Sequence, residues 1–294
     1  MKVFLKKEWL MENHTEWMKQ EFLYYHANDF PKQTTHLTYF ALTDALIHHA
    51  SKVDKPILYA WPTDKVIFLG MIDTKLPHLT DGIKVLGNAG YDAIVRNSGG
   101  LAVVSDPGVL NFSIIFPEED HIRLKINDAY ERMHYIISNA LKPYNVEVTA
   151  EEVPDSYCPG DYDLSINRRK IAGISQRRIK GGLAIMIYVS IDGIQDERSL
   201  LIKDFYEKGL QDEKVRWHFP DINPDVMTTV TDEIDGTINV NQMTEHIVEL
   251  FKTIGSVTQG KYTESMMTEY QTSYNKMVDR NERMLKDLFD QEAY

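Results

Sequence analysis

The sole cysteine of the chain, Cys158, lies in the segment Tyr157-Cys158-Pro159-Gly160-Asp161. Neighbouring Pro and Gly are typical of a loop, so the thiol is expected at a surface or a cleft. A thiolate is a nucleophile, and nearby positive charge favours it over the thiol. Cys158 is therefore a candidate nucleophile. The alternative is an inert cysteine that packs as a small hydrophobe.

A run of basic residues follows the cysteine within residues 168–180. It contains no acidic residue, and its members are Arg168, Arg169, Lys170, Arg177, Arg178 and Lys180. If this segment passes near the loop, its charge would favour the thiolate. Because the whole chain carries a net charge of −12, a local basic patch could also guide an acidic partner protein, with Arg177 and Arg178 as the docking candidates. A solvated strand face explains the same charges.

Two adjacent glycines, Gly99 and Gly100, follow Arg96-Asn97-Ser98. Adjacent glycines let a backbone approach a ligand closely or adopt a positive φ, but a tight turn explains them equally well. The sequence contains no GxGxxG or GxxxxGK[ST] pattern, so no nucleotide-binding loop is predicted. The histidines, including the pair His48-His49, show no metal-ligand spacing. We therefore expect no cofactor and no metal.

Composition limits the class of protein. The chain has 294 residues, a mass of 34.0 kDa and one cysteine, which excludes an intramolecular disulfide framework and a multi-cysteine zinc site. The acidic balance argues against general nucleic-acid binding. The longest apolar run, residues 182–191, is too short to span a membrane, and the start MKVFLKKEWLMEN does not resemble a signal peptide. A cytoplasmic protein without a membrane partner is expected.

The elements that must position these residues follow from hydrophobic periodicity and turn signals. A mixed or antiparallel sheet with helices packed against it, of the α/β or α+β class, is therefore expected. Two apolar runs around Gly181-Gly182 predict a hairpin. Helices are predicted at 37–52, 80–89 and 127–142, and the part of the chain from 198 onward, including a tail at 241–290, is predicted to be mainly helical. Strands are predicted at 57–61 and 66–70, joined by Pro62-Thr63-Asp64, and at 93–96, 101–104, 110–116 and 146–150.

Three blocks of the sequence are RNSGGLAVVSDPGVLN (96–111), CPGDYDLS (158–165) and RRKIAGISQRR (168–178). In their order and separation they resemble the lipoate–protein ligase, octanoyltransferase and biotin ligase superfamily. The resemblance implies a mixed, largely antiparallel central sheet flanked by helices, with a tunnel for an eight-carbon acyl chain. It places an acyltransferase catalytic domain at 35–250, an N-terminal extension at 1–34, and a helical C-terminal segment at 251–294 that packs on the same domain.

The resemblance also implies a chemistry. Cys158 would carry the acyl group as a thioester, and Lys170 would hold the acyl carbonyl. Arg96, Ser98, Gly99, Gly100 and Gly173 would bind the substrate. The glycine block and the cysteine loop look like the amidotransferase branch, whose members take an octanoyl group from the lysine of the glycine-cleavage H protein. The acceptors would be lipoyl domains of 2-oxoacid dehydrogenase complexes, and no ATP would be needed because one amide replaces another.

Two departures from other branches support this assignment. Leu101 stands where ATP-using ligases tend to have a third glycine, and Ser105 follows Val104 where carrier-protein octanoyltransferases tend to have a histidine. The alternatives are an ATP-dependent lipoate or octanoate ligase, an octanoyltransferase that uses acyl carrier protein, and a non-catalytic lipoyl-domain binder. For Lys170, the alternative is a solvent-exposed strand lysine. No histidine is assigned as a general base, and a lipoyl group could be moved as well as an octanoyl group.

Overall fold

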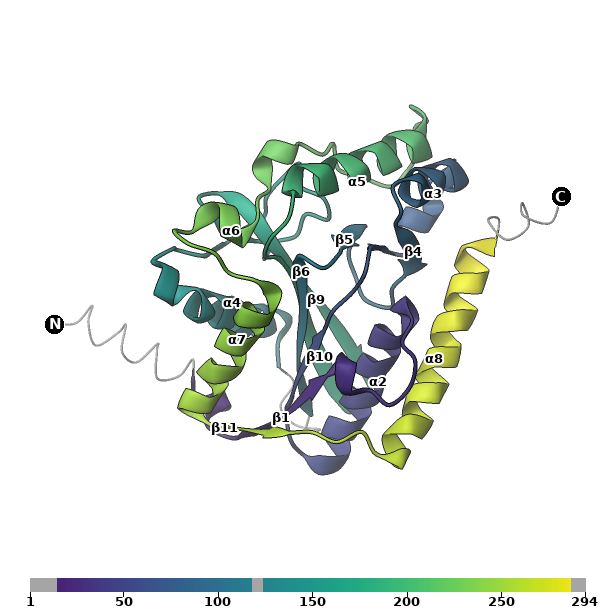
Figure 1. Ribbon diagram of the computed structural model, residues 1–294. Helices are drawn as coiled ribbons and strands as arrows, with labels where there is room; N and C mark the ends of the chain where they lie inside the picture. Colours follow the sequence, from purple (N-terminus) through teal and green to yellow (C-terminus); the bar gives the residue numbers. More distant parts are fainter. Residues whose placement is uncertain (1–14, 118–123, 287–294) are drawn as a thin grey trace.

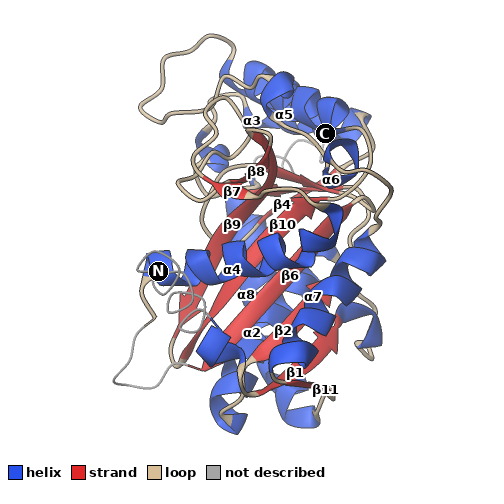
Figure 2. Cartoon of the chain, turned by 90° about the vertical axis from the view of Figure 1, so that its left-hand side faces the viewer, coloured by secondary structure: helices blue, strands red, loops and turns tan. Residues whose placement is uncertain are grey.

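An eight-stranded sheet forms the centre of the molecule in the computed structural model, which describes residues 15–117 and 124–286 (Figure 2). In spatial order its strands are β11 (Ser256–Gln259), β1 (Glu21–His26), β2 (Ile57–Trp61), β6 (Val109–Pro117), β10 (Gly182–Ser190), β9 (Arg169–Ile179), β8 (Leu164–Ile166) and β7 (Thr149–Ala150). Strand β1 runs parallel to β2 and β11, and every other neighbouring pair is antiparallel. This arrangement confirms the predicted mixed, largely antiparallel sheet.

A second, smaller sheet lies beside the first. Its central strand, β3 (Val66–Leu69), pairs in parallel with β4 (Asp92–Val95) and antiparallel with β5 (Val103–Ser105). The predicted strands at 57–61 and 66–70 both form, but they belong to different sheets. The turn at Pro62-Thr63-Asp64 therefore carries the chain from one sheet to the other.

Helices cover both faces of the large sheet (Figure 1). Helices α4 (Ile126–Ala140) and α7 (Val240–Ile254) lie on one face, and α2 (His36–Val53) and α8 (Glu264–Met284) lie on the other. Helices α3 (Leu79–Asn88) and α5 (Gln195–Leu210) pack together beside the small sheet. The remaining helical turns are α6 (Val230–Glu233), η1 (Glu16–Met18), η2 (Ala27–Asp29), η3 (Asp73–Lys75), η4 (Lys142–Tyr144) and η5 (Pro224–Val226).

Strand β10 shows why the longest apolar run of the sequence is needed. Successive side chains of a strand point to opposite faces. Leu183, Ile185 and Ile187 join the core under α4 and α7, whereas Ala184 and Met186 join the core under α2 and α8. The run is apolar because both faces of the strand are covered. Among the helices of the described residues, none is both long and apolar enough to cross a bilayer.

The ends of the chain differ most from the prediction. The predicted tail at 241–290 is not one helix, because β11 separates α7 from α8. Both β11 and β1 were missed, and β7 is shorter than the predicted strand at 146–150. Strand β11 has four residues and lies at the sheet edge, mostly exposed, so it carries little apolar alternation. The start MKVFLKKEWLMEN lies outside the described residues, as do the rest of 1–14 within the predicted extension 1–34 and the last eight residues, 287–294.

Candidate functional site

Cys158 lies in the loop between β7 and β8, with its side chain half-buried. Its φ of 51° is left-handed, a conformation that costs free energy for any residue except glycine. The neighbouring Tyr157 is wholly buried and anchors the loop in the core. The backbone N–H of Leu101 donates a hydrogen bond to Sγ of Cys158 over 3.1 Å. The thiol is thus held at a defined place.

A cation also contacts the sulfur. The buried guanidinium of Arg96 lies with Nη2 3.7 Å from Cys158 Sγ, and it donates to the carbonyls of Gly99 and Leu101 over 3.1 and 2.6 Å. No carboxylate of the described residues forms an ion pair with Arg96 within 4.0 Å. A cation at this position stabilises negative charge that develops on the sulfur during a reaction. The sequence predicts this charge from the basic run at 168–180, but the cation beside the sulfur in the structure is Arg96.

Residues 96–102, here called the glycine loop, connect β4 to β5 and carry both groups that contact the sulfur. Gly100 has a φ of 97°, and a Cβ atom there would lie 2.8 Å from Cys158 Sγ and 2.5 Å from Arg96 Nη2. A Cβ at Gly99 would meet nothing within 4 Å. Only the second glycine is therefore required by the packing around the thiol.

This difference gives a matched pair of variants. Gly100→Ala should strain the backbone by about 1–3 kcal/mol and push the thiol away from Leu101 and Arg96. We expect this variant to slow alkylation of Cys158 by iodoacetamide about tenfold or more. In Gly99→Ala, Cys158 should be alkylated at the wild-type rate. Equal rates for the two alanine variants would contradict this account of the loop.

Lys170 is wholly buried, so the alternative of a solvent-exposed strand lysine is wrong. Its ammonium donates to Ser156 Oγ over 3.1 Å and to the carbonyls of Tyr157 and Cys158 over 3.0 and 2.8 Å. It also forms an ion pair with Asp163 at 2.9 Å. Since an ammonium has three N–H donors, these four acceptors occupy it fully. In this arrangement Lys170 holds the loop between β7 and β8, residues 151–163, here called the cysteine loop. Contact of Lys170 with an acyl carbonyl stays a prediction.

Asp163 completes the support of that loop. Its Oδ2 accepts hydrogen bonds from the backbone N–H groups of Gly160 and Val153 over 3.2 and 3.3 Å, while Oδ1 faces Lys170. Burial raises the pKa of Asp163, and the Lys170 ammonium opposes that rise. Asp163 lies within the block at 158–165 but is not among the predicted site residues. A carboxylate three residues beyond a Pro-Gly turn was the available signal.

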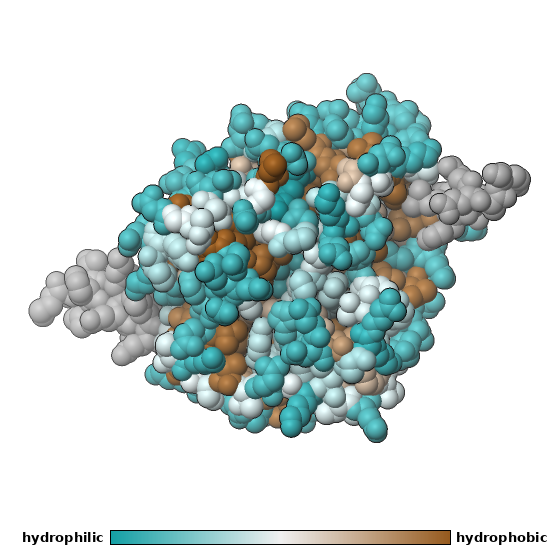
Figure 3. Space-filling model, viewed as in Figure 1, coloured by the Kyte–Doolittle hydropathy of each residue, from teal (hydrophilic) through white to brown (hydrophobic). Residues whose placement is uncertain are grey.

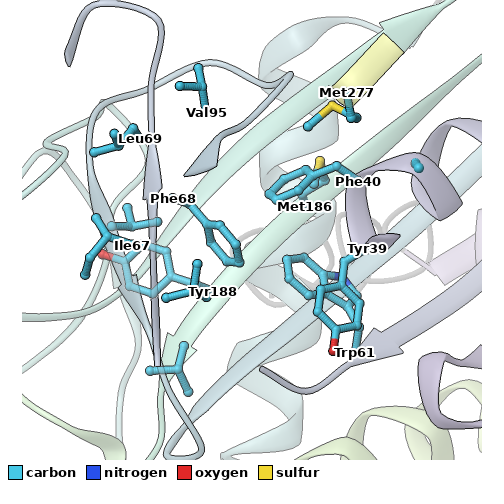
Figure 4. Close-up of a cluster of buried hydrophobic side chains, with 14 of the residues drawn as sticks. Tyr39, Phe40, Trp61, Ile67, Phe68, Leu69, Val95, Met186, Tyr188 and Met277 are labelled. Carbon is cyan, nitrogen blue, oxygen red and sulfur yellow. The ribbon is translucent and has the colours of Figure 1, made fainter. Parts of the chain in front are cut away.

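Next to the thiol is a cavity of about 500 Å³. This volume lies within the range of about 300–1,000 Å³ that small-molecule sites occupy. Apolar side chains from α2, β2, β3 and β10 form much of its wall. Among them, Phe40, Trp61, Phe68, Met186 and Tyr188 belong to the cluster of buried side chains in Figure 4. At Gly173 a Cβ atom would lie 2.7 Å from the Tyr188 ring, so glycine leaves room for that ring. Such a wall suits an aliphatic chain.

The cavity brings together all five of the predicted substrate-binding residues. Arg96, Ser98, Gly99, Gly100 and Gly173 line it along with Cys158, whereas Lys170 does not. The buried Ser98 hydroxyl has no hydrogen-bond partner among the described residues. Because a buried polar atom normally has a partner, this hydroxyl is available to a polar atom of a ligand.

The two predicted docking residues lie in different environments. Arg177 donates to both carboxylate oxygens of Asp44 on α2 over 2.9 and 2.8 Å, and this hydrogen bonding raises its pKa. Arg178 donates to the carbonyl of Leu124 and to Gln176 Oε1 over 2.7 and 2.8 Å, and it lines the cavity. A joint docking role for the two stays a prediction, with Arg178 the better placed.

The described residues hold no group of three or more His, Cys, Asp or Glu side chains arranged to bind a metal ion. The surface seen in Figure 3 is mainly hydrophilic with separate hydrophobic patches. The Cys158 sulfur lies on the wall of an apolar cavity, which fits its predicted role as a nucleophile toward a group carried by an apolar chain; that role stays a prediction.

Comparisons with known proteins bear on this site. Residues 35–252 match the lipoyl protein ligase A/B catalytic domain. The chain is 38% identical over 246 residues to an octanoyl-[GcvH]:protein N-octanoyltransferase of Macrococcus caseolyticus, covering 83% of this chain and 89% of that protein. It is also 38% identical to a lipoyl-[GcvH]:protein N-lipoyltransferase of Listeria monocytogenes, covering 84% of this chain and 89% of the relative.

Solved structures share the fold at lower identity. A putative lipoate protein ligase of Thermoplasma acidophilum with bound lipoic acid superposes with a TM-score of 0.65 at 17% identity, covering 88% of this chain and 95% of that one. A lipoate-protein ligase A bound with ATP gives the same TM-score of 0.65 and identity of 17%, covering 88% and 94%. At 17% identity, these two similarities show that the chain shares the fold of those proteins and no more than the fold.

Proposed function

The chain belongs to the lipoyl protein ligase A/B catalytic domain family and is an acyltransferase, and from this premise we propose that it moves an octanoyl group between the lysines of two proteins through a thioester on Cys158. The proposed donor is the glycine-cleavage H protein, and GcvH stands in the names of the relatives that this chain matches. The proposed acceptors are lipoyl domains of 2-oxoacid dehydrogenase complexes. We further propose that it acts in the cytoplasm.

The observation that carries the proposal is the position of the Cys158 sulfur. It lies on the wall of an apolar cavity, and both Leu101 N–H and the Arg96 guanidinium contact it. Both contacts stabilise negative charge on sulfur. The cavity wall would bury the hydrocarbon chain and so bring its carbonyl carbon to the nucleophile.

The reaction balances without nucleotide. The Cys158 thiolate attacks the carbonyl carbon of the octanoyl amide, the C–N bond breaks, and the donor lysine leaves as an amine after taking up a proton. The acceptor lysine amine then attacks the thioester, loses a proton and becomes the new amide, while the thiolate is released. The oxyanion of each step needs a hydrogen-bond donor. We propose that Lys170 holds the cysteine loop in both steps. We also propose that its ammonium gives up one of its present hydrogen-bond acceptors and donates to the oxygen of the acyl carbonyl instead.

Incubation of the protein with an octanoylated H protein and an apo lipoyl domain, without nucleotide, tests the proposal. We expect octanoyl transfer and a transient mass gain of one octanoyl group on the enzyme. Transfer only from free octanoate plus ATP would indicate an ATP-dependent ligase. Transfer only from octanoyl-acyl carrier protein would indicate an octanoyltransferase that uses acyl carrier protein. Binding without transfer would indicate a non-catalytic lipoyl-domain binder. A lipoylated donor in parallel compares the two acyl groups, since relatives of both kinds match.

The proposed contribution of Arg178 to docking can be measured separately. Arg178→Gln removes the charge on the cavity wall but retains a polar side chain. It should raise KM for the protein donor at low ionic strength and have less effect at high ionic strength, because salt screens exposed charges. A KM that rises equally at both ionic strengths would assign Arg178 to packing instead.

A further inference from the structure

The peptide unit between Leu101 and Ala102 is hydrogen-bonded at both of its ends. Its carbonyl accepts from Arg96 Nη2 over 2.6 Å, and its N–H, that of Ala102, donates to the Tyr206 hydroxyl over 3.2 Å. The preceding N–H, that of Leu101, donates to Cys158 Sγ. Because Gly100 restrains the backbone little, the direction of the Leu101 N–H depends on how the following peptide is held.

The Tyr206 hydroxyl is itself oriented by a buried carboxylate. It donates its one proton to Asp73 Oδ1 over 2.9 Å, so its oxygen is left to accept from Ala102. Asp73 Oδ2 accepts from the Gly70 N–H over 2.7 Å, at the end of β3. Tyr206 is 2% exposed and Asp73 is wholly buried. Burial raises the pKa of Asp73 to about 6, while these two hydrogen bonds and the Arg96 charge oppose the rise.

We propose that Tyr206 and Asp73 are positioning residues for the nucleophile: they hold the glycine loop so that the Leu101 N–H points at Cys158 Sγ. Among the described residues, neither side chain forms a hydrogen bond with the sulfur, and both act through the backbone of Leu101 and Ala102. The inference rests on the proposed function only in taking Cys158 as the reacting group.

The ring of Tyr206 has a separate structural role. It packs against Phe205 and Phe219, with ring centroids 5.0 and 5.3 Å apart. Tyr206→Phe keeps this packing and removes only the hydroxyl, so the loop loses its anchor while the core keeps its shape. Tyr262→Phe is a matched control. Tyr262 lies between β11 and α8, and its hydroxyl donates to the carbonyl of His26, at the end of β1, over 3.1 Å.

Two measurements on the full chain test the proposal. In Tyr206→Phe, amide hydrogen exchange of the glycine loop should become about fivefold faster or more, from the loss of one hydrogen bond. Alkylation of Cys158 by iodoacetamide should slow by about threefold to tenfold at neutral pH, and its pH profile should move to higher pH. Tyr262→Phe should change neither. A general loss of stability alone would leave the pH profile of alkylation in place.

Asp73→Asn provides a second variant if Tyr206→Phe folds poorly. Its carboxamide has one acceptor oxygen where the carboxylate has two, so either Gly70 or Tyr206 loses its partner. Faster hydrogen exchange in the glycine loop is expected again. Wild-type exchange in both variants together with a wild-type alkylation profile would overturn the proposal. That outcome is distinct from failure of the proposed function, which would appear as no octanoyl transfer by the wild-type protein.

Discussion

Cys158→Ala should lose octanoyl transfer almost completely, by roughly four to six orders of magnitude, as enzymes do when a covalent nucleophile is removed. The structure gives a local reason for expecting little loss of fold. Cys158 is half-buried in a loop, and its side chain makes hydrogen bonds only with Leu101 and Arg96 among the described residues. Intact mass after exposure to the octanoylated donor should show the acyl adduct on the wild type and none on the variant.

Cys158→Ser is the matched control for binding. It keeps the size and the hydrogen-bonding capacity of the side chain but replaces a good nucleophile with a poor one. It should bind the octanoylated donor about as tightly as the wild type while transferring at the rate of the alanine variant. Full transfer by either variant would remove the thioester from the mechanism, even if the fold and the cavity were unaffected.

The sequence predicted much of the fold because its strongest signals are periodic. The apolar face of α2, the doubly buried strand β10 and the hairpin at Gly181-Gly182 follow from patterns that any sheet with helices on both faces would need. Strand β1 was missed because its buried residues, Phe22 and Tyr25, are three apart and so lack the alternation typical of a strand. Strand β11 was missed because its pairing at the sheet edge depends on backbone hydrogen bonds with a segment more than two hundred residues away. Such pairing leaves little trace in either segment alone.

The candidate site was predicted in part. The blocks at 96–111, 158–165 and 168–178 contain Cys158, Arg96 and Lys170, and the fold brings them together. Their partners could not be predicted. Tyr206 is an unremarkable tyrosine in a helix, and Asp73 follows a turn; only the packing of α5 against the small sheet shows that they support the glycine loop. Local sequence identifies reactive groups better than it identifies the residues that hold them.

The site thus joins two loops with separate supports. The glycine loop is held by Tyr206 and Asp73, and the cysteine loop is held by Lys170 and Asp163. The loops meet where the Leu101 N–H and Arg96 contact the sulfur. A defect in either support should therefore reduce the reactivity of the Cys158 sulfur, although no hydrogen bond or ion pair among the described residues joins the two supports.

The support of the cysteine loop leads to a large predicted effect on stability. Lys170→Met should lower the free energy of unfolding by about 3–5 kcal/mol, because Asp163 would remain buried without its partner. Lys170→Met/Asp163→Asn removes that uncompensated charge and should recover most of the loss. Urea unfolding of the two variants and the wild type measures both changes. No difference in stability between the single and the double variant would contradict the buried ion pair.

The stable double variant then separates two roles for Lys170. If the ammonium only holds the loop, rates of Cys158 alkylation and of octanoyl-enzyme formation should fall by the same factor, since both report the placement of the sulfur. If it also reaches the acyl carbonyl, octanoyl-enzyme formation should fall by a further factor of about 10²–10³, the usual effect of losing an oxyanion donor. Wild-type rates in both assays would leave Lys170 with a role in stability alone, because neither the sulfur nor the carbonyl would then depend on it.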